Sequence, residues 1–155
     1  MQIRDATPHD VPAVLPMVDA ISRLHASWDP ARFRTTASVL DSYRAWLTAR
    51  ATDPRAVFLL AERDGRVVAY LIGTIEDEIP IYWTPQTGWI HDLWVDPTYR
   101  NEGLGRQMTM LAVERFRTLG MTQVRLQTAS ANDVGRTLFT QCGFRNSTVE
   151  MICEL

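Results

Sequence analysis

The sequence has few cysteines, little excess charge and no long apolar run. Its only cysteines, Cys142 and Cys153, lack CxxC or metal-ligand spacing and do not suggest a disulfide framework, which favours a reducing compartment. A formal net charge of −2 gives no overall basic surface for nucleic acid. The longest apolar run, residues 67–72, is too short to cross a bilayer, and charged Arg4 and Asp5 stand where a signal peptide needs an apolar core. We therefore expect a soluble, cytoplasmic protein with no nucleic-acid partner, no membrane partner and no metal.

The chain also lacks internal repeats, low-complexity segments and linker-like stretches. Its 155 residues correspond to one domain of ordinary size. Hydrophobic residues at 46% and charged residues at 22% are typical of globular proteins and argue against a disordered chain. We predict a single domain that covers residues 1–155.

Hydrophobic periodicity and turn residues divide the chain into strands and helices. Thr7-Pro8-His9-Asp10 is typical of a helix start, Pro16 should kink or divide the helix that follows, and Asp64-Gly65 predicts a tight hairpin. The order strand, helix, helix, three strands, helix, strand, helix, strand implies a mixed sheet with helices on both faces. The predicted strands are residues 2–6, 56–62, 67–75, 88–95, 124–128 and 148–153, and the later predicted helices are residues 37–50, 104–119 and 132–141.

The most informative stretch is the glycine-rich loop Arg100-Asn101-Glu102-Gly103-Leu104-Gly105, which joins a predicted strand to a predicted helix. Glycines permit close backbone approach, and the first N–H groups of a helix lack intrahelical partners, so such a loop favours a phosphate or pyrophosphate. A dinucleotide fingerprint needs a third glycine where Met108 stands, and a P-loop needs Gly-Lys-Ser/Thr, which the chain lacks. A plain tight turn is the alternative interpretation.

Val95-Asp96-Pro97 followed by Arg100-x-x-Gly103-x-Gly105 resembles the acyl-CoA motif of the GNAT superfamily of N-acetyltransferases, Arg/Gln-x-x-Gly-x-Gly/Ala. Asn132, Leu138-Phe139 and Cys142-Gly143-Phe144 are similar to a later segment of that family. The resemblance implies an α/β (α+β) acyl-CoA N-acyltransferase fold, with a central mixed, mostly antiparallel sheet flanked by helices. It also implies direct transfer of an acetyl group from acetyl-CoA to a primary amine of a small molecule, an amino-acid-like compound or a peptide, with no acyl-enzyme.

The same resemblance implies where acetyl-CoA binds. Backbone groups of the strand before the loop would bond the pantetheine arm, the loop amides would take the pyrophosphate, and two arginines would supply positive charge. Either arginine can instead be a solvated surface charge, and Asn132 can instead be a plain helix N-cap. The implied cofactor-binding residues are Leu93, Trp94, Val95, Arg100, Asn101, Glu102, Gly103, Leu104, Gly105, Arg106, Asn132 and Phe139.

Transfer to an amine requires a base, because amines with a pKa near 10 are almost entirely protonated at about pH 7. His91 is our candidate for this base, since imidazole titrates near pH 6.5, and its alternative is a structural histidine. Strand alternation places His91 and Leu93 on one face and Asp92 on the other. Asp92 is a second catalytic candidate that could orient the base, bind a cationic substrate or only cap a loop. Phe139 stands where many family members have a tyrosine as general acid, and a phenyl ring cannot donate a proton.

Substrate selection in this family usually falls to the first helices and the loop after the third strand. Aromatic and acidic residues there would suit a cationic amine, although core aromatics and surface acids are equally good interpretations. The candidates are Trp28, Phe33, Glu78 and Tyr82. A non-catalytic acyl-CoA-binding sensor of the same fold is the alternative function, motivated by Phe139. By analogy with the family, the last predicted strand could pair across a homodimer.

Overall fold

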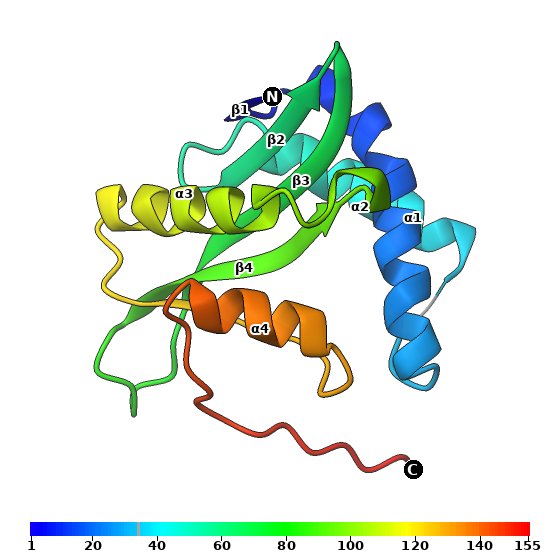
Figure 1. Ribbon diagram of the computed structural model, residues 1–155. Helices are drawn as coiled ribbons and strands as arrows, with labels where there is room; N and C mark the ends of the chain where they lie inside the picture. Colours follow the sequence, from blue (N-terminus) through cyan, green and yellow to red (C-terminus); the bar gives the residue numbers. More distant parts are fainter. Residues whose placement is uncertain (34) are drawn as a thin grey trace.

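The computed structural model describes residues 1–33 and 35–155, and it contains a five-stranded sheet with helices on both sides (Figure 1). The strands lie side by side in chain order, with three antiparallel pairings followed by a parallel pairing of β4 with β5. This confirms the expected mixed, mostly antiparallel sheet flanked by helices. The elements are β1 Gln2–Asp5, η1 Pro8–Asp10, α1 Val11–Trp28, α2 Ala37–Arg50, β2 Val57–Arg63, β3 Arg66–Asp77, β4 Gln86–Val95, η2 Pro97–Tyr99, α3 Leu104–Thr118, β5 Val124–Leu126 and α4 Asp133–Gln141.

Local sequence decides most of these boundaries. Asp64 and Gly65 adopt φ values of 52° and 75°, the left-handed conformation that a two-residue hairpin turn between β2 and β3 requires. Pro16 lies inside α1, which continues undivided. Of the two expected outcomes, division of the helix at Pro16 does not occur, because burial of Val14 and Val18 on either side outweighs the one backbone hydrogen bond that proline cannot donate. A kink at Pro16 stays a prediction.

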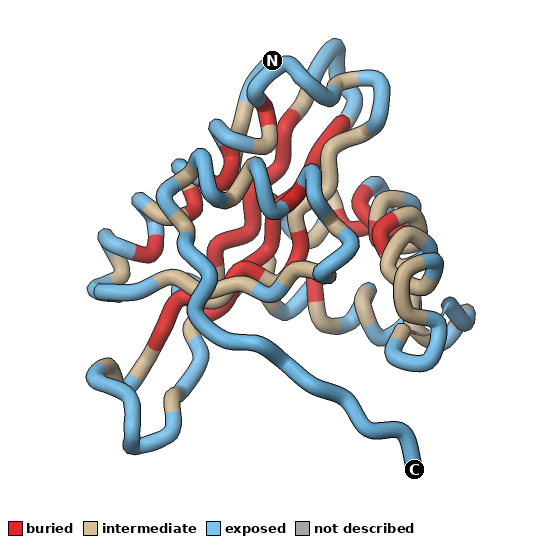
Figure 2. The backbone as a smooth tube through the Cα atoms, turned by 60° about the horizontal axis from the view of Figure 1, so that its bottom comes forward, coloured by how far each residue is buried: buried red, intermediate tan, exposed pale blue. Residues whose placement is uncertain are grey.

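Residues 145–155 have no regular structure and are exposed along their whole length (Figure 2). The predicted strand at residues 148–153 is therefore wrong. A strand obtains its backbone hydrogen bonds from a neighbouring strand, and in the described part of the chain no strand pairs with this segment. An ion pair of 2.8 Å between Arg32 and Glu150 connects the tail to the segment after α1.

The sheet is buried on both faces, which explains the nearly continuous apolar runs of β2 and β3. Phe58 and Leu60 pack in a cluster with residues of α1 and α2. Leu59 and Ala61 alternate with them along β2 and pack in a second cluster with residues of α3. The face covered by α1 and α2 and the face covered by α3 are named here the α1/α2 face and the α3 face.

Two glycines allow α3 to lie close to the sheet. A Cβ at Gly73 would stand 2.8 Å from the ring of Phe116, and one at Gly88 would stand 2.6 Å from it. Both distances are too short for a real side chain, so glycine is required where the ring lies on β3 and β4. Phe116 is fully buried in this contact. The glycines thereby set the distance of α3 from β4, and with it the position of the loop that begins α3.

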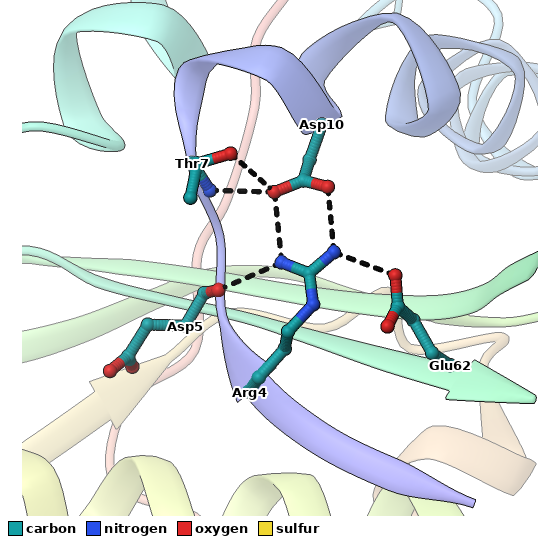
Figure 3. A network of polar contacts seen from close by, with 5 residues as sticks. All are labelled: Arg4, Asp5, Thr7, Asp10 and Glu62. Atoms are coloured by element: carbon teal, nitrogen blue, oxygen red, sulfur yellow. Dashed lines mark hydrogen bonds and ion pairs between the residues drawn. The ribbon is translucent and has the colours of Figure 1, made fainter. Parts of the chain in front are cut away.

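Arg4 joins the first strand to the first helical turn and to β2 (Figure 3). Its guanidinium donates to both carboxylate oxygens of Asp10, at 2.9 and 2.7 Å, and to Glu62 at 2.6 Å. Asp10 also accepts from the amide and the hydroxyl of Thr7, each at 2.8 Å, which is the helix start that the sequence predicts. The Arg4 guanidinium holds the pKa of Asp10 well below its usual range.

Candidate active site

The second half of β4 has a free backbone edge. Its pairing with β5 ends at Ile90 opposite Leu126. On the other side β4 stays paired with β3, and the amide of Asp96 donates to the carbonyl of Val68 at 2.9 Å. Because hydrogen-bonding directions alternate along an antiparallel pair, the backbone groups of Leu93 and Val95 face the side beyond the end of β5. In the described part of the chain, no strand covers that edge.

The glycine-rich loop lies next to this edge and ends in the first turn of α3. Asn101 and Gly103 adopt φ values of 65° and 79°, so the loop uses two left-handed residues to turn from β4 into the helix. Gly103 is the N-cap and offers no side-chain acceptor. The amides of Leu104, Gly105 and Arg106 therefore have no intrahelical acceptor and form a set of donors at the positive end of the helix dipole.

The charged side chains of the loop differ in whether they already have partners within the protein. Arg100 folds back on β4, where its Nε donates to the carbonyl of Val95 at 2.9 Å and its guanidinium lies 4.7 Å from the centre of the Trp94 ring. Glu102 pairs with Arg63 at 3.3 Å. Arg106 is exposed on the first turn of α3. The structure thus places Arg106 beside the free amides, and it uses Arg100 to hold the end of β4.

Asn132 and Phe139 lie at the two ends of α4. The Asn132 side chain caps α4, accepting from the amide of Gly135 and donating to the hydroxyl of Thr128, both at 3.0 Å. Phe139 packs edge-on against Phe144, with ring centres 5.9 Å apart. The N-cap interpretation of Asn132 therefore describes its contacts within the chain, and a contact with acetyl-CoA stays a prediction.

His91 stands at a β-bulge, and this changes the expected faces of β4. Ile72 pairs with Asp92 and Gly73 pairs with Ile90, so His91 is an extra residue on β4. Ile90 and Leu93 belong to the cluster on the α3 face. His91 and Asp92 both contact residues of the α1/α2 face instead. The prediction that His91 shares a face with Leu93 is wrong, because simple alternation fails at a bulge.

The imidazole of His91 is half-buried and has defined partners. Its Nε2 lies 2.6 Å from the hydroxyl oxygen of Thr74 and 3.5 Å from Oε1 of Glu76, both on β3. The ring meets Trp46 of α2 edge-on, with ring centres 5.3 Å apart. Burial lowers the pKa of His91 below its ordinary value, and the Glu76 carboxylate only partly opposes this shift. The ring is therefore neutral at neutral pH, the state that a general base needs.

Asp92 is buried, with 7% of its surface exposed. The phenol of Tyr70 donates to its Oδ2 at 3.2 Å. Burial raises the pKa of Asp92 to about 6, and the phenols of Tyr43 and Tyr70 oppose this rise by hydrogen bonding. The carboxyl is thus a core group between sheet and helices, shared by two tyrosines.

The four substrate candidates form two separate groups. Trp28 and Phe33 surround His25 at the end of α1, with ring centres 5.6 and 4.9 Å from the imidazole. Glu78 and Tyr82 lie after β3, where Glu78 pairs with Arg125 at 3.1 Å and the Arg125 guanidinium lies 4.4 Å from the centre of the Tyr82 ring. Both groups already have partners of their own.

Sequence reasoning missed two residues that contact His91, namely Trp46 and Thr74. A single threonine in an apolar strand, such as Thr74, is common and does not by itself indicate a site. Tyr43 and Trp46 stand three residues apart on α2 and form an edge-on aromatic pair, with ring centres 5.8 Å apart. That spacing on one helix face was the signal that could have found them.

Comparison with known proteins decides the family. Residues 18–144 match the profile of the acetyltransferase (GNAT) family. The chain belongs to this family. A mycothiol acetyltransferase of Sanguibacter keddieii is 31% identical over 94% of this chain and 50% of its own length. An L-methionine sulfoximine/L-methionine sulfone acetyltransferase of Pseudomonas paraeruginosa is 28% identical over 94% of this chain and 80% of its own length. The chain spans half or less of the length of the mycothiol acetyltransferases that it matches.

Solved structures confirm the fold. A mutant protein of Bacillus halodurans superposes with a TM-score of 0.88 at 22% identity, over 100% of this chain and 99% of its own. A predicted acetyltransferase of Clostridium acetobutylicum, solved with acetyl-CoA, gives a TM-score of 0.79 at 16% identity, over 99% of this chain and 95% of its own. Identities this low carry the fold alone.

No three His, Cys, Asp or Glu side chains among the described residues gather in a way that could hold a metal ion. None of the described helices combines the length and the apolar character that a membrane span requires.

Proposed function

We propose that this protein transfers the acetyl group of acetyl-CoA directly to the primary amine of a small, amino-acid-like molecule. The observation that carries the proposal is the free edge of β4 beside the uncapped start of α3, with the neutral imidazole of His91 on the same strand. These groups match the separate needs of a pantetheine arm, a pyrophosphate and an amine that must lose a proton.

The residues present fit acetyl-CoA. The free amides of Leu104, Gly105 and Arg106 would take the pyrophosphate, and the backbone groups of Leu93 with the amide of Val95 would bond the pantetheine arm, because the Val95 carbonyl already accepts from Arg100. Bound acetyl-CoA supplies the thioester that reacts. The N–H of Leu93 faces the free edge of β4 and would serve as the donor to the thioester oxygen.

His91 would accept the proton that the attacking amine loses. Phe139 has no proton to give to the leaving thiolate, so that proton would come from solvent or from the imidazolium of His91. Asp92 would have a structural role, in which its hydrogen bonds with Tyr43 and Tyr70 stabilise the side of the site on the α1/α2 face. The relatives named for L-methionine sulfoximine and L-methionine sulfone favour an amino acid derivative over a peptide as the acceptor.

The first experiment measures binding and turnover in one preparation. Acetyl-CoA should raise the unfolding temperature of the protein. When an amino acid derivative is added as acceptor, the enzyme should release CoA thiol from acetyl-CoA. The chain contains no lysine, so the enzyme's own side-chain amines cannot contribute to thiol release. Stabilisation without thiol release on any amine would instead support an acyl-CoA sensor, and no stabilisation would reject both functions. Light scattering on the same sample tests the homodimer, which stays a prediction.

The second experiment tests His91. We expect His91→Gln to lower kcat on the order of 10²-fold or more, with acetyl-CoA affinity unchanged, because a general base contributes about that much. His9→Gln is the matched control, since His9 is exposed in η1 near the N-terminus. An unaltered kcat in His91→Gln would remove His91 as the base.

A further inference from the structure

A continuous line of hydrogen bonds leads from His91 to the surface. Nε2 of His91 lies 2.6 Å from Oγ1 of Thr74, and Oγ1 of Thr74 lies 2.5 Å from Oε1 of Glu76. Thr74 is buried, with 5% of its surface exposed, whereas half of the Glu76 side chain is exposed. The two β3 residues stand two positions apart, so the strand itself holds both on the face that carries His91.

The chemistry of the three groups fixes the direction of the line. An ionised carboxylate can only accept, so the single hydroxyl proton of Thr74 must point to Glu76. The Thr74 oxygen is then left as an acceptor toward His91, and Nε2 must be the nitrogen that carries the ring proton. A neutral imidazole has one N–H, so the free lone pair of His91 is on Nδ1.

We propose that Thr74 and Glu76 are positioning residues that hold His91 as the Nε2–H tautomer and so present Nδ1 as the proton acceptor. The inference deepens the proposed function, on which its kinetic part rests. When the attacking amine gives up its proton, a new N–H bond forms at Nδ1 and the Nε2–H bond stays intact. The resulting imidazolium is stabilised by the Glu76 carboxylate through the Thr74 hydroxyl, as a second hydrogen-bonded group stabilises a base in other enzymes.

The other groups that face His91 do not offer a competing partner. On α2 the contact is the edge of the Trp46 ring. The nearest acid on β4, Asp92, is engaged with Tyr70 and Tyr43. Among these neighbours Glu76 is the charged group that raises the pKa of His91, against the lowering by burial. Removing its charge should therefore lower the pKa of the ring.

The tautomer can be measured without any turnover. The ¹⁵N chemical shifts of the His91 ring distinguish a protonated Nε2 from a protonated Nδ1, and the spectrum of His91→Gln identifies its signals among the three histidines. We expect the Nε2–H form in the native protein, and a mixture or the other tautomer in Thr74→Val. A native ring protonated at Nδ1 would overturn the proposal. This result stands even if no acceptor amine is found, so it separates this inference from the proposed function.

Kinetics test the contribution to catalysis. Thr74→Val keeps the shape of the buried side chain and should lower kcat about tenfold with acetyl-CoA affinity unchanged, whereas Thr74→Ser should restore it. Glu76→Gln should move the acidic limb of the kcat/KM profile to lower pH, because the base then loses its proton more easily. Asp77→Asn is the matched control, since Asp77 lies next in the strand and bonds to Gln86. Native pH profiles and rates in both Thr74→Val and Glu76→Gln would refute the role.

Discussion

Asp92→Asn should change how the stability of the protein depends on pH. In the native protein, burial raises the pKa of Asp92, so the folded state binds the proton of this carboxyl more tightly than the unfolded chain does. For a carboxyl with a raised pKa, the free energy of unfolding falls as pH rises through the window between the two pKa values. It levels off above the folded value, because the carboxyl is then ionised in both states. Asparagine does not titrate, so the variant lacks this fall.

The structure sets the size of the effect. The pKa of Asp92 rises from 3.8 to about 6. A difference of about two pH units corresponds to roughly 3 kcal/mol, at about 1.36 kcal/mol per unit. Hydrogen bonds from Tyr43 and Tyr70 already reduce this cost, since they favour the ionised form. We therefore expect the variant to gain roughly 3 kcal/mol relative to the native protein between about pH 4 and pH 7.

Urea unfolding followed by circular dichroism at several pH values measures this difference. The pH dependence of the difference matters, because a constant offset reports only how well the asparagine amide fits between two phenols. Subtracting the free energy of unfolding of the native protein from that of the variant also cancels the contributions of other titrating groups. One of these is Asp10, whose contribution to the pH dependence has the opposite sign. If the free energies of unfolding of the variant and of the native protein differed by the same amount at every pH, the pKa of Asp92 would not be raised. A native kcat in the same variant would show that Asp92 acts through packing and not in proton transfer.

Substitutions at three other positions test contacts that stabilise the fold. Gly88→Ala should cost about 1–3 kcal/mol, measured by urea unfolding, because its Cβ would stand 2.6 Å from the Phe116 ring. Arg4→Met should cost about 1–2 kcal/mol at neutral pH, and this cost should shrink below pH 3.8 as Asp10, whose pKa is depressed from that value, is protonated. Asn132→Ala should lower the free energy of unfolding by about 1 kcal/mol through loss of the α4 cap, whereas Asn132→Asp should retain the cap. Acetyl-CoA titrations of both variants test the predicted contact of Asn132 with acetyl-CoA.

The sequence was sufficient for elements whose local signals and burial agree. The inward stripe of α3, from Leu104 through Met108 to Phe116, is buried as its helical spacing predicts. The hairpin at Asp64-Gly65 also formed, because its turn needs residues that tolerate positive φ. The predicted terminal strand at residues 148–153 did not form. A strand depends on a neighbouring strand, and the alternation of its own side chains does not indicate whether a neighbouring strand is available.

The candidate site was predictable only in part. The glycine-rich loop could be placed because Gly103 and Gly105 stand between a segment with strand character and a segment with helical periodicity. The surroundings of His91 could not, since they depend on how β3 aligns with β4 and on where α2 packs. A shift of one residue in that alignment exchanges the two faces of the strand. The bulge at His91 introduces such a shift, and nothing in the local composition of β4 announces it.

This bulge accounts for two features of the site together. The last pair between β4 and β5 joins Ile90 to Leu126, and the extra residue on β4 comes directly after Ile90. A bulge bends its strand and increases the local twist, which turns the rest of β4 away from a straight neighbour. The same residue that brings the imidazole to the α1/α2 face therefore also marks where the edge of β4 becomes free. The proposed proton acceptor and the proposed opening for the pantetheine arm therefore depend on the same bulge, and neither can move along β4 without the other.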